Sequence, residues 1–333
     1  MKKDKVLAMI ISGGDGYVSG ESVSRELGIT RAAVNAAVKQ LREQGYGIES
    51  STRKGYKLVS SPDIINSGEI LARLPEGRSG DIHVLPTVGS TNTKLKDYAR
   101  LNAPAGTVVL AEEQTGGKGR RGRAFVSPSG SGIYLSYLLN PASGRESISE
   151  ITAWTAVAVR DAISEVCGVT CDIKWVNDLL INKHKICGIL TELSVVAETG
   201  EIDNVIIGIG INVNQKKDDF PEEIRDVATS ISAECGGKIF ARADLAACLI
   251  RNLDELAASW PSGKARYIEQ YREACITTGT KVSVNNLAGD SSRTGKAVRI
   301  NDDFSLQVLF DDTNTEERVN SGEVSVRGLY GYT

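Results

Sequence analysis

The sequence predicts an α+β protein whose chain divides into three regions of different pattern. Residues 1–60 are basic and contain short helical segments followed by two strand-like segments. Residues 66–272 combine apolar strands with longer helices, which predicts a mixed sheet with flanking helices. From residue 275 onward only short alternating strands with Gly and Asn-Asp turns remain, which predicts a small antiparallel β-barrel.

Composition limits the possible classes of protein. The 333 residues are 41% hydrophobic and 24% charged, as in a soluble chain long enough for two or three domains. The first apolar run, residues 6–11, is too short to span a bilayer and lacks a cleavage region. We therefore expect a cytoplasmic protein without a membrane partner.

The cysteines and histidines argue against two further kinds of site. Six cysteines occur without a Cys-x-x-Cys pair, and the only histidines are His83 and His184. We expect no metal site made of side chains, and few bases are available for a Ser-His-Asp or Cys-His mechanism. The thiols are expected to be reduced and structural.

Three helices and a hairpin are expected in residues 1–60. The first helix covers residues 6–12, the second follows the N-cap Ser19 and ends at Gly28, and the third follows the N-cap Thr30 and covers residues 31–44. Two short helices joined by a tight turn have helix-turn-helix dimensions. The alternating strands of residues 46–59 predict a wing.

The charge of this region favours DNA as its partner. Residues 1–60 hold ten Lys/Arg against six Asp/Glu, a charge of +4 in a chain of net charge −3. A three-helix bundle without a ligand would show the same apolar stripe, so that alternative stays open. For DNA binding, base contacts are expected from Thr30, Arg31 and Asn35, and phosphate contacts from Lys39, Arg42, Arg53 and Lys54. One such module is small, so useful specificity requires a dimer.

After a polar linker at residues 60–63, the central region alternates strands and helices. Strands are expected near residues 81–85, 106–112, 132–139, 172–175, 179–182, 185–196 and 204–214, and helices near residues 91–100, 148–167 and 241–260. The last of these helices is expected to contribute packing only.

The segment of residues 114–123, Gln-Thr-Gly-Gly-Lys-Gly-Arg-Arg-Gly-Arg, is the strongest sign of a binding site. It places four cations and four glycines in a loop between two strands. Neighbouring unit charges about 4 Å apart interact by roughly 4 kcal/mol at an effective dielectric of about 20, so a counter-anion such as phosphate is expected. Glycines also let backbone N–H groups approach an anion. A solvated basic loop is the alternative.

Other nucleotide motifs are excluded by context. Gly117, Gly119 and Gly122 spell G-x-G-x-x-G, but the following residues predict no helix as a dinucleotide fold requires. Gly-Lys-Ser/Thr is absent, and so are the kinase His-Arg-Asp and Asp-Phe-Gly elements.

Two further segments carry polar groups where a ligand could bind. Residues 89–92, Gly-Ser-Thr-Asn, precede a helix, where Ser90 or Thr91 could simply be the cap. Residues 174–179 place an Asn-Asp turn between apolar runs, with Lys174 before it and Lys185 after it. These cations indicate a second set of ligand contacts.

Five segments together resemble the motifs of biotin protein ligases: residues 89–92, 117–123, 174–178 (Lys-Trp-Val-Asn-Asp), 185–188 (Lys-Ile-Cys-Gly) and 208–214 (Gly-Ile-Gly-Ile-Asn-Val-Asn). With the basic region in front and residues 321–327 behind, the chain resembles the bifunctional form, the biotin operon repressor. The resemblance implies a winged helix-turn-helix DNA-binding domain at 1–60, a class II synthetase-like ligase domain at 66–272, and an SH3-like β-barrel at 275–333.

The resemblance also implies a reaction and its partners. The biotin carboxylate attacks the α-phosphate of MgATP, pyrophosphate leaves, and biotinyl-5′-AMP then acylates a lysine of biotin carboxyl carrier protein. Mg²⁺ would be held mainly by phosphates, and no protein metal site is implied. Operator DNA and a ligand-promoted homodimer complete the expected partners. A lipoate-type ligase and a non-enzymatic sensor with a winged helix are the alternatives.

The resemblance also implies which residues bind biotin, which bind ATP and which are catalytic. Biotin would be bound by Ser90, Thr91, Asn92, Gln114, Gly117, Lys118, Gly119, Arg120, Lys185 and Gly188. ATP would be bound by Arg120, Arg121, Arg123, Lys174, Asn177 and Asn212. The catalytic residues would be Lys185, Arg120 and Asp178, with Asp178 orienting the metal-bound phosphate or deprotonating the acceptor lysine.

Two residues depart from the usual family pattern. Lys118 stands where arginine is usual, and a lysine cannot make a planar bidentate contact with the adenylate. Val176 stands where proline is usual between Trp175 and Asn177, which leaves the stiffness of this turn in question.

Overall fold

The N-terminal region folds into three helices followed by a hairpin, as the sequence predicts. Helices α1 (Lys2–Ser12), α2 (Gly20–Leu27) and α3 (Arg31–Glu43) precede the antiparallel strands β1 (Gly47–Ser51) and β2 (Gly55–Ser60). The Ser19 and Thr30 hydroxyls accept hydrogen bonds from backbone N–H groups at the starts of α2 and α3, and Gly28 ends α2 at φ 61°. An apolar core that includes Leu7, Val34 and Leu41 belongs to this region alone.

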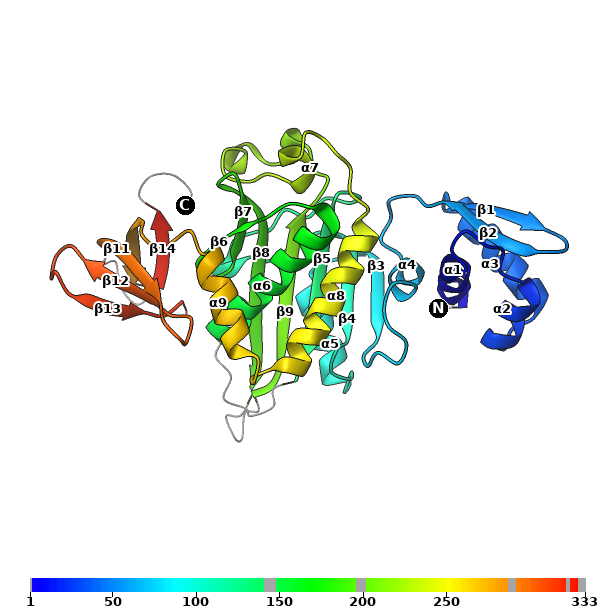
Figure 1. Ribbon diagram of the computed structural model, residues 1–333, viewed down its shortest axis with the longest axis horizontal. Coiled ribbons are helices and arrows are strands. Elements are labelled where there is room, and N and C mark those ends of the chain that lie inside the picture. The colour runs from blue at the N-terminus through cyan, green and yellow to red at the C-terminus, as the bar shows by residue number, and fades with distance from the viewer. Residues whose placement is uncertain (1, 141–147, 196–201, 287–291, 322–323, 329–333) are drawn as a thin grey trace.

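The computed structural model describes residues 2–140, 148–195, 202–286, 292–321 and 324–328, and its three regions lie side by side along the longest axis (Figure 1). A short helix, α4 (Ser67–Leu71), lies between the N-terminal and central regions. Among the described residues, no helix is both long and apolar enough to cross a bilayer.

A seven-stranded mixed sheet forms the central region. Its order is β3-β4-β5-β9-β8-β7-β6, in which only the β3–β4 pair is parallel among the described strands. The strands are β3 (Ile82–Val88), β4 (Val108–Gln114), β5 (Gly132–Leu139), β6 (Asp172–Lys174), β7 (Asp178–Ile181), β8 (His184–Val195) and β9 (Ile202–Asn212). The mixed sheet with flanking helices therefore agrees with the sequence prediction.

Helices cover both faces of this sheet. On one face lie α6 (Ile148–Cys167), α8 (Arg242–Ser259) and α9 (Lys264–Ala274) (Figure 1). On the other face α5 (Thr91–Arg100) packs Leu95 against Val109, Leu138 and Ile206. Three 3₁₀ turns, η1 (Arg120–Gly122), η2 (Lys217–Asp219) and η3 (Glu222–Ile224), and the short α7 (Ile231–Glu234) lie in the connections.

The C-terminal region is an antiparallel sheet of five described strands. Its order is β13-β12-β11-β10-β14, with β10 (Lys281–Asn286), β11 (Ser292–Ile300), β12 (Leu306–Phe310), β13 (Glu316–Val319) and β14 (Val324–Gly328). Its buried side chains, including Val282, Phe304 and Val308, join the same apolar core as the helices of the central region. The C-terminal region is thus packed into the central one.

Candidate functional site

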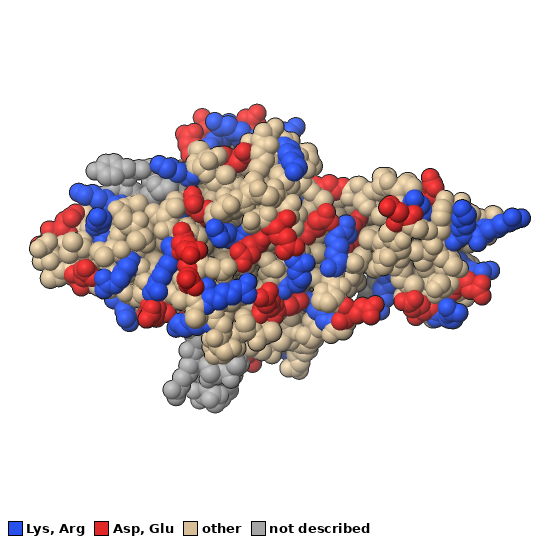
Figure 2. Space-filling view, in the orientation of Figure 1, with Lys and Arg blue, Asp and Glu red and all other residues tan. Residues whose placement is uncertain are grey.

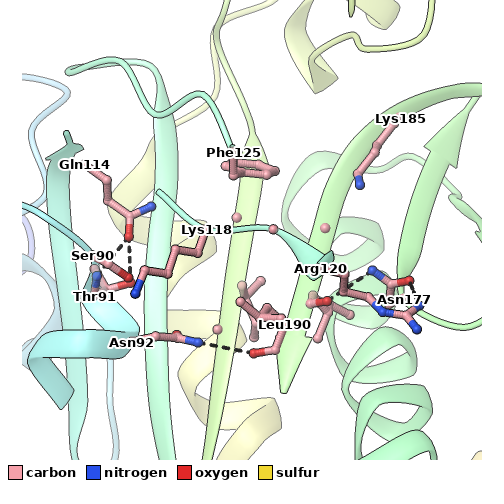
Figure 3. Close-up of a pocket in the computed structure, with 16 residues that line it drawn as sticks. Ser90, Thr91, Asn92, Gln114, Lys118, Arg120, Phe125, Asn177, Lys185 and Leu190 are labelled. Carbon is pink, nitrogen blue, oxygen red and sulfur yellow. Dashed lines mark hydrogen bonds between the residues drawn. The ribbon is translucent and has the colours of Figure 1, made fainter. Parts of the chain in front are cut away.

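A pocket lies on the α5 side of the central sheet, where residues of α5, β4, η1, β8 and β9 meet (Figure 3). Its empty volume, including the open mouth, is about 460 Å³. Nine of the ten residues expected to bind biotin line it: Ser90, Thr91, Asn92, Gln114, Lys118, Gly119, Arg120, Lys185 and Gly188. Asn177, expected to bind ATP, lines it as well.

One end of the pocket is lined by hydrogen-bonding groups, with the cation Lys118 beside them. Gln114, the last residue of β4, accepts hydrogen bonds on Oε1 from the Thr91 backbone N–H at 2.9 Å and the Thr91 hydroxyl at 3.1 Å. Gln114 Nε2 donates to Ser127 Oγ at 3.0 Å, so the amide orientation is fixed from both sides. The Ser90 hydroxyl, on a residue only 5% exposed, makes no cap bond to α5. Capping therefore does not account for Ser90, and its hydroxyl lines the pocket.

Asn92 is held by a buried network beneath the pocket. Its Nδ2 donates to Glu192 Oε2 at 2.7 Å, and its Oδ1 accepts from Ser136 Oγ at 2.5 Å. Lys96 Nζ donates to the other Glu192 oxygen at 2.6 Å. Burial by itself raises the pKa of Glu192, but the hydrogen bonds from Lys96 and Asn92 outweigh it, so the pKa lies below its usual value. Glu192 is therefore a carboxylate that orients Asn92.

Glycines of β9 make room for this network. A Cβ on Gly208 would lie 2.2 Å from Asn92 Oδ1, and a Cβ on Gly210 would lie 2.4 Å from the Phe125 ring. The pocket residues not predicted from the sequence are Phe125, Ile189, Leu190, Gly208, Ile209 and Gly210. The signal that could have found the two glycines is their position inside an otherwise apolar strand, where glycine indicates a close approach.

The opposite end of the pocket is cationic. Lys185 Nζ donates to Asp178 Oδ1 at 2.7 Å across the β7–β8 pair. Arg120 donates to Asn177 Oδ1 at 2.8 Å and to the Ser321 carbonyl oxygen at 2.6 Å. Burial lowers the pKa of the Arg120 guanidinium, although the nearby Asp178 charge opposes the shift. Two cations with fixed partners thus face an anion-sized space.

The cations of residues 114–123 do not all reach this space. Lys118 and Arg120 line the pocket, whereas the exposed Arg121 and Arg123 do not. Lys118 Nζ donates to Thr93 Oγ1 at 3.3 Å, at the hydrogen-bonding end of the pocket and away from Lys185. The loop folds back on itself through bridges and η1, and Arg121 adopts φ 61° at the reversal. The expectation that four cations gather about one anion is therefore not met by this geometry.

Four other expected residues lie outside the pocket lining, and one of them is Asp178, the partner of Lys185. Gly117 lies in the loop, where a Cβ would come 2.4 Å from the Phe125 carbonyl oxygen. Asn212 is 4% exposed and donates from Nδ2 to the Thr229 carbonyl oxygen at 3.0 Å. Lys174, on β6, is also outside.

The turn at Trp175–Asn177 is held by the C-terminal region. Trp175 donates from its backbone N–H to Thr277 Oγ1 and from Nε1 to the Phe304 carbonyl oxygen, both at 2.9 Å. The Asn177 carbonyl oxygen accepts from Ile189 N at 2.9 Å, and Val176 is 1% exposed. These contacts fix the turn although Val176 replaces the usual proline.

The residues expected to bind DNA lie on α3 and the hairpin, and several have partners within the region. Arg31 pairs with Glu21 at 2.9 Å, and Asn35 accepts a hydrogen bond from Tyr56. Arg42 donates to the Ile48 carbonyl oxygen and to Ser50, so it braces the hairpin and differs from the expected simple phosphate contact. The helix cap Thr30 and the residues Lys39, Arg53 and Lys54 are exposed. Figure 2 shows basic side chains at the outer end of this region, where Figure 1 places the hairpin.

Comparisons with known proteins identify the central and N-terminal regions. Residues 84–212 match the Biotin/lipoate A/B protein ligase family, and residues 2–57 match an HTH domain. The chain is 40% identical over 241 residues to the bifunctional ligase/repressor BirA of Bacillus subtilis, covering 72% of this chain and 73% of that protein. It is 31% identical over 249 residues to BirA of Escherichia coli, covering 75% and 74%.

A solved structure supports the ligase fold. The biotin protein ligase of Aquifex aeolicus in complex with biotin and ATP matches with a TM-score of 0.64 and 30% identity, covering 74% of this chain and 99% of that chain. A helix-turn-helix region joined to a ligase fold of the biotin/lipoate type defines a class of two-function proteins. Within that class, the chain belongs to the family of bifunctional ligase/repressor proteins.

Proposed function

We propose that this chain is an ATP-dependent biotin protein ligase that forms biotinyl-5′-AMP and transfers biotin to a lysine of biotin carboxyl carrier protein. The observation that carries the proposal is one pocket with a hydrogen-bonding end at Thr91 and Gln114 and a second end where the cations Lys185 and Arg120 lie. Biotin has the matching polarity, because its ureido ring is neutral and its carboxylate is anionic. The reaction requires positioning and electrostatic stabilisation rather than a protein nucleophile.

Each end of the pocket has a role in this proposal. Ser90, Thr91 and Gln114 hold the ureido group, while Asn92 shapes the floor. The carboxylate and the α-phosphate lie beside Lys185 and Arg120. The biotin carboxylate oxygen attacks the α-phosphorus, pyrophosphate leaves, and the acceptor amine later attacks the acyl carbon and releases AMP.

Asp178 has a narrower role than the sequence suggested. Its Oδ1 is bonded to both Lys185 Nζ and Asn177 Nδ2, at 2.7 and 3.1 Å. In this position it holds Lys185 toward the pocket and balances its charge until the anionic substrates arrive. The remaining proposed nucleotide contacts, Arg121, Arg123, Lys174 and Asn212, would require movement of their segments. Magnesium is proposed to be held mainly by ATP phosphates.

The N-terminal region is proposed to repress biotin genes when the adenylate is bound. Two copies of α3, related by the two-fold axis of a ligand-promoted homodimer, would contact an inverted operator repeat. We assign residues 1–60, 66–272 and 275–333 to DNA binding, ligation and an SH3-like barrel, and we place the protein in the cytoplasm. A gel shift should depend on biotin and ATP together.

Pyrophosphate release tests the enzyme assignment. Lys185→Ala should abolish biotin-dependent pyrophosphate release without loss of folding, because it removes one of the three cations that line the pocket. The control Lys238→Ala changes an exposed lysine outside the pocket lining and should retain normal activity. Near-normal release by Lys185→Ala would remove this residue from the mechanism.

The two alternatives make different predictions. A non-enzymatic sensor would release no pyrophosphate with any acid. A lipoate-type ligase would adenylate lipoate in preference to biotin, which competition between the acids would reveal. Lipoate lacks a ureido group, so the hydrogen-bonding end at Thr91 and Gln114 favours biotin. Transfer of labelled biotin to a carrier domain, with and without ATP, completes the test.

A further inference from the structure

Arg242, the first residue of α8, is a fully buried cation outside the pocket lining. Its side chain is 0% exposed. It donates from Nε to Asp63 Oδ2 at 3.1 Å and from Nη2 to the Asp63 carbonyl oxygen at 2.6 Å. It also donates from Nη1 to Glu112 Oε2 at 2.8 Å and to the Gly132 carbonyl oxygen at 3.1 Å. The guanidinium therefore joins the linker at Asp63 to two strands of the ligase sheet.

The same linker is held by further bonds from the central region. The Arg242 backbone N–H donates to Asp63 Oδ1 at 3.1 Å, and Asn214 Nδ2 donates to Asp63 Oδ2 at 3.1 Å. The Ile65 backbone N–H donates to Glu112. Both the side chain and the backbone of the linker are therefore fixed on the ligase domain. We call Asp63, Arg242 and Glu112 the linker triad.

The fixed linker leads directly into contacts with the DNA-binding region. Asn66 caps α4 by accepting from the Gly68 backbone N–H at 2.7 Å. A Cβ on Gly68 would lie 2.4 Å from the Asp4 carbonyl oxygen of α1, so α4 touches α1 directly. On the other side, Arg73 pairs with Glu69 of α4 at 2.6 Å and with Asp244 of α8. The linker and α4 therefore connect the DNA-binding region to one end of α8.

We propose that Arg242 is a positioning residue for DNA recognition, because the linker triad fixes the orientation of the N-terminal region relative to the ligase domain. This inference rests on the proposed DNA-binding function. In a two-fold dimer, the orientation of each N-terminal region sets the separation of the two recognition helices and hence the half-site spacing. A flexible joint would accept many spacings. The linker triad permits few arrangements, since moving the linker away would leave the buried guanidinium without its Asp63 side-chain and backbone acceptors.

Operator spacing is the measurement that tests this role. The full-length protein, with biotin and ATP, first selects its operator from a pool of random DNA. The operator is then resynthesised with the spacer between the half-sites changed by about half a helical turn, roughly five base pairs. The wild type should lose at least about tenfold in affinity on the altered spacer, because the recognition helices then face different sides of the duplex. Asp63→Asn, at a side chain 32% exposed, should reduce that loss to less than about threefold.

Two controls separate positioning from folding. Asp63→Asn should keep normal pyrophosphate release, because Asp63 lies outside the pocket lining. Glu165→Gln breaks an exposed ion pair with Arg251 within the central region and should keep the wild-type spacing dependence. Arg242→Lys, which keeps the charge but loses the planar fork, should behave like Asp63→Asn.

The outcomes distinguish this inference from the function on which it rests. Folded Asp63→Asn and Arg242→Lys proteins with wild-type spacing dependence would overturn the positioning role. A wild-type protein that selects no DNA would instead overturn the proposed repressor function, and the inference with it. Relaxed spacing in both variants, with pyrophosphate release intact, supports the role of the linker triad.

Discussion

The central domain is joined to its two neighbours by different kinds of contact. At the C-terminal junction, the fully buried Phe304 packs on Tyr271 of α9 with ring centroids 5.5 Å apart, inside one continuous apolar core. At the N-terminal junction, the neighbour keeps an apolar core of its own, and the linker is held by Arg242 and its carboxylate partners. The two neighbours lie beyond opposite edges of the central sheet, the N-terminal region near β3 and the C-terminal region near β6 (Figure 1).

The two junctions therefore have different roles: the C-terminal junction stabilises the central domain, and the N-terminal junction orients the DNA-binding region. Shared apolar burial contributes free energy to both domains at once, so the C-terminal region belongs to the folding unit of the ligase. Hydrogen-bonded ion pairs have directional geometry but contribute little net stability, so they orient a region that folds on its own core. The ligase pocket depends on the C-terminal junction, because carbonyl oxygens of the C-terminal region accept hydrogen bonds from Trp175 and Arg120.

The largest expected effect comes from opening the shared core. Phe304→Ala should lower the unfolding free energy of the ligase domain by about 3–5 kcal/mol, since a buried ring is replaced by a cavity. Leu41→Ala should cost about 2–5 kcal/mol, but only in the N-terminal region. Calorimetry should show that the two variants shift different transitions. A single transition lowered equally by both variants would contradict the division into two folding units.

A smaller effect is expected from one hydrogen bond at the C-terminal junction. Thr277→Val removes the acceptor of the buried Trp175 backbone N–H and should cost about 1–3 kcal/mol. The KM for ATP should also rise, because the turn carries Asn177, which holds Arg120. Denaturant unfolding and steady-state kinetics measure both quantities. The matched variant Thr313→Val, at an exposed site, should be close to neutral.

A pH-dependent effect is expected beside Phe304. Burial raises the pKa of Asp303, but hydrogen bonds from Ser305 and the charge of Arg318 lower it overall. A lowered carboxyl pKa stabilises the fold above the unfolded pKa of about 3.9, and this stability disappears as the pH falls through the folded value. Asp303→Asn should therefore cost less than about 1 kcal/mol at neutral pH and progressively less below about pH 4.

The comparison variant for this experiment is Asp302→Asn. Asp302 is 92% exposed on its side chain and pairs with Arg272 at 2.7 Å. Urea unfolding between neutral pH and about pH 3 measures the free energy of unfolding of both variants. If the unfolding free energy lost in Asp303→Asn instead grew toward low pH, the pKa of Asp303 could not be lowered by folding, and its hydrogen bonds from Ser305 would not be the cause.

The smallest effect concerns the rate of thiol modification. Burial raises the pKa of Cys275, which lies at the C-terminal junction and is 6% exposed. Native protein should therefore react with iodoacetamide more slowly at Cys275 than at the less buried Cys235. Mass spectrometry after timed alkylation measures both sites. Phe304→Ala should accelerate only Cys275 if the junction opens locally.

Much of the fold could be predicted from local pattern. The helix predicted at residues 148–167 has those bounds in the structure, because its periodicity extends over 20 residues. Ser19, Thr30 and Gly28 occupy the predicted caps for the same local reason. Helix α8, predicted at residues 241–260 to contribute packing only, has a further contact, since its first residue, Arg242, binds Asp63 of the linker.

The polar residues of the pocket could be predicted from the sequence, but its apolar residues could not. Ser90, Gln114 and Lys185 carry recognisable chemistry at recognisable spacing. Phe125 and Leu190 carry no such signal, and they become lining residues only when separate segments pack together. That Arg123 lies outside the pocket lining could be seen only in the folded loop, because sequence spacing does not determine which cation of a basic run faces the pocket.

The sequence alone therefore determined most helices and strands, although not α4, and the residue types that chemistry at this site requires. Tertiary structure decided which side chains meet. Arg120 is held by Asn177, 57 residues away, and by Ser321, 201 residues away. Periodicity and capping act over a few residues, whereas the destination of a charged side chain depends on partners that only folding brings within hydrogen-bonding distance.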